Sequence, residues 1–217
     1  APQVTAALPS TIVVKTPLYT ATLSTLGAQI TSFKLGRYLT TMDKDARPVE
    51  MLKAPMPALS LSKGATDAGV VYAAAEKGTV TVTDTPRAIE FTAQTSGGIT
   101  LRKIYTVDPK TYLLGYQTVI ENRGASPVAV SGEMLFPNLY PLDKKLEGYA
   151  FQGPVFLGKH LEEFDIKKVK KPLSHREFTD KIQWFGFEDK YFLQAVISKT
   201  APDATLTVQR TDEKVVE

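Results

Sequence analysis

Apolar and polar residues alternate in short runs over the first two thirds of the chain. In the run "AIEFTAQT", for example, Ile89, Phe91 and Ala93 fall on one face of an extended segment. Turn residues such as those from Asp84 to Arg87 separate the runs. Alternation with a period of two, bounded by turns, is typical of antiparallel strands. The pattern from Thr11 to Glu133 therefore predicts an all-β fold with little helix.

Two segments of this region depart from simple alternation. In "ITLRKIYTV" the apolar positions are Ile99 and Leu101 and then Ile104, a slip of one residue that predicts a β-bulge near Lys103. The segment "YLLGYQTVIEN", residues 112–122, has apolar residues on both faces. Such a segment predicts a central strand that is covered on both sides.

The character of the chain changes after Phe136, where prolines, glycines and then charged residues predominate. We expect a long and partly irregular excursion from Leu142 to Lys181. Within it, Leu161 and Phe164 are three residues apart, which predicts a short helix. Long loops in compact domains are commonly functional, so this excursion is a candidate interaction surface.

The segment "IQWFGFEDKYFLQAVI", Ile182 to Ile197, predicts a tight hairpin whose turn contains Glu188 and Asp189. Alternation places Trp184 and Phe187 on opposite faces of the first arm. The aromatic side chains could line a groove for an extended apolar segment of a partner. The alternative is that they pack in the core.

Length and composition bound the class of protein. A chain of 217 residues with 43% hydrophobic residues predicts one large β-sandwich domain over residues 11–217, preceded by a linker over residues 1–10. The absence of cysteine removes disulfides and thiol nucleophiles. No apolar run approaches the ~18 residues needed to span a bilayer, and the start of the chain lacks the pattern of a signal peptide.

The formal net charge of +3 is too small to indicate a nucleic-acid partner. Basic residues do cluster in "KKVKK", at the four positions Lys167, Lys168, Lys170 and Lys171. This run fits a protein partner or an anionic membrane surface. The competing interpretation is a solvated loop.

Candidate catalytic groups are sparse. His160 and His175 lie among Glu162, Glu163 and Glu177, so a general acid and a general base could be assembled there. However, histidines in a charged and exposed segment are usually surface residues. The common nucleophile, phosphate-binding and metal-binding motifs are missing from the sequence. We therefore expect no enzyme activity, no cofactor and no metal.

Three stretches of the sequence together resemble the large periplasmic domain of the YidC-type bacterial membrane protein insertases. They are "TPLYTATLSTLGAQITSFKLGRY", with its turn at Gly27-Ala28, "YLLGYQTVIENRGASPV" and "WFGFEDKYFLQAVI". The ordered set carries the resemblance, since sugar mutarotase-like sandwiches share the first pattern alone. The resemblance implies a twisted antiparallel sandwich similar to galactose mutarotase, held outside the inner membrane between two transmembrane helices.

The resemblance also implies a function. Such a domain assists insertion and folding of inner-membrane proteins, acting on nascent membrane proteins with or without the Sec translocon. By position, residues 149–181 correspond to the part that contacts the accessory subunit of the translocon. The candidate partner-binding residues are Lys167, Lys168, Lys170 and Lys171 of this segment, with Trp184 and Phe187 of the aromatic hairpin that follows it. Relatives continue beyond the last block, so we expect a domain truncated at its C-terminus. The alternative function is a mutarotase-like protein that binds or epimerises sugars.

Overall fold

The computed structural model describes residues 8–62, 65–94, 98–128, 133–139, 151–164, 175–200, 203–209 and 215–216. The chain forms two compact units, residues 1–135 and residues 136–217. Nearly all regular structure is β-strand, so the all-β prediction is confirmed. The single-domain boundaries stay a prediction. Among the described residues, no helix is long and apolar enough to cross a bilayer.

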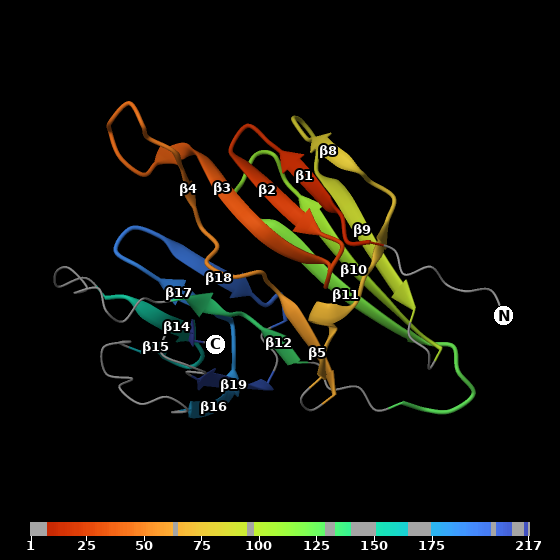
Figure 1. The fold of residues 1–217 in the computed structure, drawn as a ribbon. Coiled ribbons are helices and arrows are strands. Elements are labelled where there is room, and N and C mark those ends of the chain that lie inside the picture. Colours follow the sequence, from red (N-terminus) through yellow and green to blue (C-terminus); the bar gives the residue numbers. More distant parts are fainter. Residues whose placement is uncertain are drawn as a thin grey trace. The chain divides into compact units, whose positions relative to one another are not determined.

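The first unit contains two main sheets (Figure 1). In spatial order, the first sheet consists of β4 (Pro48–Glu50), β3 (Gln29–Leu39), β2 (Tyr19–Ser24), β1 (Thr11–Lys15) and β8 (Gly78–Thr81). The second consists of β11 (Leu114–Asn122), β10 (Ile99–Val107), β9 (Arg87–Gln94) and β7 (Ala73–Ala74). All of these pairs are antiparallel except that of β1 with β8.

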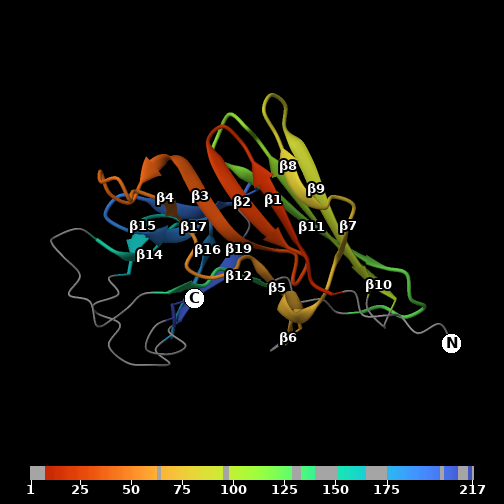
Figure 2. The ribbon, with the colours of Figure 1, turned by 45° about the horizontal axis from the view of Figure 1, so that its top comes forward.

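A shared core joins these two sheets into a sandwich. Val14 and Leu23 of the first sheet are fully buried in the same apolar cluster as Phe91 and Leu101 of the second. In the turned view of Figure 2, β1, β2 and β3 are drawn in red to orange, and β9, β10 and β11 of the second sheet are drawn in yellow-green to green. The predicted inward face of β9 is confirmed, because Ile89, Phe91 and Ala93 are all buried. Burial of such side chains contributes roughly 1.5–3 kcal/mol each.

The β-bulge predicted near Lys103 is absent. Strand β10 keeps a continuous register with both neighbours from Ile99 to Val107. The inward residues are Leu101, Lys103 and Tyr105, so the lysine itself occupies a core position. The apolar pattern seemed to slip because a charged residue stands where the sandwich needs an inward side chain.

The predicted central position of residues 112–122 is also wrong. Strand β11 lies at an edge of the four-stranded sheet, and its inward residues Leu114, Tyr116 and Ile120 are only half-buried. Its outward apolar residue Val119 is half-buried as well. Apolar residues on two partly covered faces therefore imitate the pattern of a central strand.

Shorter elements complete the first unit. A third sheet consists of β12 (Glu133–Leu135), β5 (Ala58–Ser62) and β6 (Ala65–Thr66). A single 3₁₀ turn, η1 (Asp67–Gly69), follows β6 directly. Asp67 is completely buried although it opens this turn.

The second unit also places strands over a core of aromatic residues. In spatial order, its larger sheet consists of β15 (Leu161–Glu163), β14 (Gly153–Leu157), β17 (Trp184–Glu188) and β18 (Leu193–Ile197). Two further pairs are formed by β16 (His175–Lys181) with β19 (Asp203–Gln209), and by β13 (Asn138–Leu139) with β20 (Val215–Val216).

Part of the predicted irregular excursion is therefore regular structure, since β14, β15 and β16 lie within it. The short helix predicted around Leu161 is wrong. Leu161 lies in β15 and is exposed, while Phe164 is buried against Phe156 and Phe178. Strand pairing with β14 overrides the helical spacing of two apolar residues.

Candidate interaction surface

The predicted aromatic hairpin is present and consists of β17 and β18. Strand β17 pairs with β18 from Trp184 opposite Ile197 to Glu188 opposite Leu193. Asp189 closes the turn, because its carboxylate accepts hydrogen bonds from the backbone N–H groups of Tyr191 and Phe192, each at 2.9 Å. Asp189 thus serves turn chemistry, as the sequence predicted, whereas Glu188 is the last residue of β17 and pairs with Leu193.

One face of the hairpin belongs to the core of the second unit. Phe187 is buried and stacks on Phe136 with ring centroids 5.5 Å apart. Phe185 lies on the same face and meets Phe136 edge to face. Stacked and edge-to-face aromatic pairs stabilise a core by about 0.5–1.5 kcal/mol beyond their burial. Phe187 therefore packs inside the unit.

The opposite face carries a row of apolar side chains across all four strands of the sheet. Directly paired residues share a face in antiparallel strands, and the register pairs Leu161 with Leu157, Leu157 with Trp184, and Trp184 with Ile197. Leu161 is 54% exposed and Ile197 is 62% exposed, while Leu157 and Trp184 are half-buried. We call these four residues the apolar row.

Close packing of β17 against β18 requires a glycine at position 186, two residues after Trp184. A Cβ at Gly186 would overlap the carbonyl oxygen of Gln194 and would lie 2.8 Å from the Cα of Ala195. The two strands therefore approach too closely for any other residue at this position. The close approach holds β18 against β17 beside Trp184.

The predicted site residues thus divide into three sets. Trp184 lies in the apolar row, Phe187 lies in the core, and the four lysines at 167, 168, 170 and 171 lie outside the described residues. Sequence reasoning missed Leu157, Leu161 and Ile197. Each of the four strands supplies one member of the row, but only the register shows which apolar residues lie side by side.

Of the candidate acid and base groups, His160 and Glu162 line a hollow on the second unit, whereas His175 is the first residue of β16. This shallow hollow is lined by Phe156, His160, Glu162, Phe178, Thr179 and Asp180. Backbone N–H groups of Lys159 and Lys181 donate to the Asp180 carboxylate, each at 2.7 Å, and lower its pKa. The lowered pKa favours the ionised carboxylate of Asp180, which therefore does not suit the role of a general acid.

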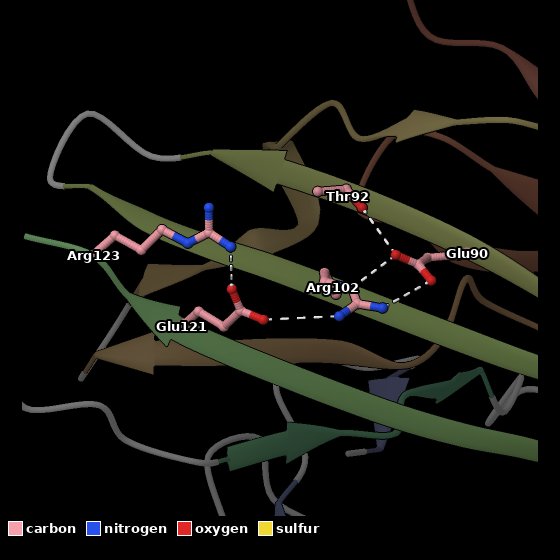
Figure 3. Close-up of polar contacts among 5 residues, drawn as sticks. All are labelled: Glu90, Thr92, Arg102, Glu121 and Arg123. Atoms are coloured by element: carbon pink, nitrogen blue, oxygen red, sulfur yellow. Dashed lines mark hydrogen bonds and ion pairs between the residues drawn. The ribbon is translucent and has the colours of Figure 1, made fainter.

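The first unit holds a charged ladder on the outward face of its second sheet (Figure 3). Arg102 makes a bidentate contact with Glu90 at 2.7 and 3.0 Å, and its guanidinium lies 3.8 Å from Glu121. Arg123 donates to Glu121 at 2.9 Å. The hydrogen bonds from Arg102 lower the pKa of Glu90. All four side chains remain solvent-accessible, so the ladder is a solvated surface network.

A second polar cluster is completely buried in the same unit. The Lys103 ammonium lies 2.5 Å from Asp67 and donates to the carbonyl of Gly27 at 2.7 Å. Tyr72 donates to the same Asp67 oxygen at 2.6 Å, and Tyr105 donates to the carbonyl of Ala28 at 2.6 Å. Burial lowers the pKa of Lys103, and the contact with Asp67 opposes this effect. We call this the buried clamp.

The buried clamp holds a strained turn. Gly27 and Ala28 have φ values of 68° and 46°, in the left-handed region that alanine disfavours. Their two carbonyl groups are the acceptors for Lys103 and Tyr105. A lysine, an aspartate and two tyrosines are also common catalytic groups, but Lys103 and Asp67 have no exposed surface, so substrate cannot reach them. The clamp is structural.

The fold and the apolar row show that this protein is an all-β domain that exposes an apolar face of one sheet. Within that class, the YidC periplasmic domain model matches residues 11–217, and the chain belongs to this family. The chain is 31% identical to the membrane protein insertase YidC of Syntrophus aciditrophicus, over 99% of this chain and 42% of the relative. For the YidC proteins of Geobacter metallireducens and Citrifermentans bemidjiense the identities are 30% and 28%, over 95% and 92% of this chain.

These comparisons confirm the resemblance found in the sequence. The chain spans about two fifths of the length of the curated relatives it matches. The family and its relatives favour a domain of an insertase, located at the periplasmic side of the inner membrane. They give no support to the mutarotase-like alternative.

Proposed function

We propose that this chain is a non-catalytic accessory domain of a membrane protein insertase. It assists the insertion and folding of newly made inner-membrane proteins, with or without the Sec translocon. The observation that carries this proposal is the apolar row, which offers accessible apolar surface on a four-stranded sheet. Three relatives that are named as insertases support it.

The apolar row fits an apolar segment of a client protein. Its two ends, Leu161 and Ile197, are exposed, and Trp184 lies at its centre as a half-buried anchor. Tryptophan at the centre of an apolar patch is the side chain most enriched among residues that dominate binding energy. The row crosses the strands, so a bound segment would contact all four of them.

The four lysines at 167, 168, 170 and 171 complete the proposal as a basic rim for the accessory subunit of the translocon. Rim charges act mainly on association rate and on salt dependence. Replacing all four by glutamine should weaken capture of the subunit, most strongly at low salt, and leave the melting temperature unchanged. If the wild type and the four-glutamine variant captured the accessory subunit equally well at low and at moderate salt, the four lysines would have no role in this binding.

The apolar row is tested by crosslinking in the full-length insertase. A photoreactive residue at Ile197 should crosslink to a ribosome-bound nascent membrane protein, and one at Val128 should not. Val128 is a matched control because it is also an exposed apolar residue, at 47%, but lies in the first unit.

A binding experiment gives the magnitude. Leu161→Ser combined with Ile197→Ser should reduce capture of the nascent chain by about fivefold or more, because residues that matter at interfaces cost more than 1 kcal/mol when truncated. Val128→Ser should capture the nascent chain as well as the wild type. Equal capture by the double variant would contradict the role of the apolar row.

A further inference from the structure

Two connections of the first unit each expose a tyrosine followed by a leucine. Tyr38 and Leu39 end β3, and Tyr112 and Leu113 precede β11. These four side chains are 49%, 56%, 37% and 62% exposed. Consecutive residues of a strand point to opposite faces, so exposure of both Tyr38 and Leu39 shows that the end of β3 lies beyond the covered part of the sandwich.

The two turns belong to different sheets but lie at the same end of the first unit. Tyr38 and Tyr112 meet edge to face with ring centroids 6.2 Å apart, and Tyr112 also lies 6.4 Å from the core residue Tyr19. The turn between β3 and β4 is closed by a hydrogen bond from the Thr40 N–H to the Arg47 carbonyl. Figure 1 shows this turn projecting beyond the sheet.

Met42 is the most exposed large hydrophobic residue in the described part of the chain. Its side chain is fully solvent-exposed at the tip of the turn between β3 and β4. We call the five residues Tyr38, Leu39, Met42, Tyr112 and Leu113 the apolar tip.

Positively charged residues outnumber negatively charged residues around the apolar tip. Over residues 34–50 and 108–113 there are five cations, Lys34, Arg37, Lys44, Arg47 and Lys110, against four carboxylates, Asp43, Asp45, Glu50 and Asp108, a difference of 5 − 4 = +1. One carboxylate, Asp108, is also engaged by the N–H of Lys110 at 2.9 Å.

We propose that the apolar tip docks on the surface of an anionic lipid bilayer. Tyrosine rings favour the membrane interface because one end is apolar and the other is polar. Leucine and methionine side chains supply apolar area to bury, and the surrounding cations are attracted to anionic headgroups. This inference is separate from the proposed function, which concerns the apolar row of the second unit.

The test uses the 217-residue chain and vesicles of phosphatidylethanolamine and phosphatidylglycerol. The chain contains no cysteine, so Met42→Cys and the control Val128→Cys can each carry a single environment-sensitive fluorophore. The label at position 42 should shift to the blue when vesicles are added, and the label at position 128 should not. Equal spectra at position 42 with and without vesicles would overturn the proposal.

Co-sedimentation with the same vesicles tests the side chains themselves. The combination Leu39→Ser, Met42→Ser and Leu113→Ser should bind at least about tenfold more weakly than the wild type, because each change removes apolar area from the contact. Val128→Ser should bind like the wild type. Equal binding by the triple variant would refute the apolar tip.

Two further arms identify the source of binding. Vesicles of phosphatidylcholine alone should bind more weakly than the anionic vesicles, and equal binding would overturn the role of charge. The variant Leu161→Ser with Ile197→Ser should keep full vesicle binding, which separates this inference from the proposed function. If the label at position 42 shifted to the blue only when a partner protein was added, the apolar tip would be a protein interface and the proposal that it docks on a bilayer would be refuted.

Discussion

Arg102 and Lys103 are consecutive residues of β10, but they form two very different ion pairs. Arg102 points outward and binds Glu90 in a solvated ladder. Lys103 points inward and meets Asp67 with no exposed surface on either side chain. The pairs have similar distances, 2.7 and 2.5 Å. Distance therefore says little about an ion pair, since desolvation sets the consequence of breaking it.

The buried pair of Lys103 and Asp67 also helps to hold a turn in place, whereas the exposed pair of Arg102 and Glu90 does not. Lys103 donates to the Gly27 carbonyl, and Tyr105, two residues later on the same face, donates to the Ala28 carbonyl. Both acceptors belong to a turn in the left-handed region. The inward face of β10 thus pins a turn that is 76 to 77 residues away in the sequence.

The largest expected effect is that of Lys103→Ala. It leaves the Asp67 carboxylate buried without its counter-ion, and such a change costs roughly 3–5 kcal/mol of unfolding free energy. Urea unfolding followed by circular dichroism measures it. The double variant Lys103→Met with Asp67→Leu should recover part of the loss, because it removes both charges together. A Lys103→Ala protein as stable as the wild type would contradict the buried clamp.

Tyr105→Phe should have an intermediate effect. It keeps the ring in the core and removes the donor to Ala28, leaving a buried carbonyl without that hydrogen bond. We expect a loss of about 1–3 kcal/mol, measured in the same urea experiment. The control is Tyr112→Phe, which changes an exposed tyrosine of the same unit and should leave stability unchanged. Equal behaviour of the two variants would show that the hydrogen bond to the turn has no special weight.

The smallest effect is expected for Arg102→Gln. Solvent screens the ladder, so stability at neutral pH should change less than in either variant above. The hydrogen bonds from Arg102 lower the pKa of Glu90 in the folded protein. The pair therefore stabilises above the ordinary pKa of glutamate, and this contribution is lost as the pH falls through the lowered pKa.

Nuclear magnetic resonance of the Glu90 carboxyl group checks the last point. In Arg102→Gln its pKa should rise towards the ordinary value of glutamate, whereas Arg123→Gln, which removes a partner of Glu121, should leave it almost unchanged. An unaltered Glu90 pKa in Arg102→Gln would contradict the assigned cause.

The sequence by itself determined the features that depend on neighbouring residues. Period-two alternation gave the inward face of β9, and Asp189 gave the hairpin turn, because side chains alternate along a strand and an aspartate side chain can bond the backbone that follows it. Alternation also placed Trp184 and Phe187 on opposite faces. The three sequence stretches identified the family.

Only the tertiary structure decided the features that depend on distant residues. Lys103 reads as a polar interruption until Asp67 and the Gly27 carbonyl are placed beside it. Likewise, register alone joins Leu161, Leu157, Trp184 and Ile197 into one row, and packing against Phe136 decides that Phe187 is the buried aromatic of the hairpin. The physical reason is that burial and pairing are set by partners far along the chain, whereas a sequence pattern records only local periodicity.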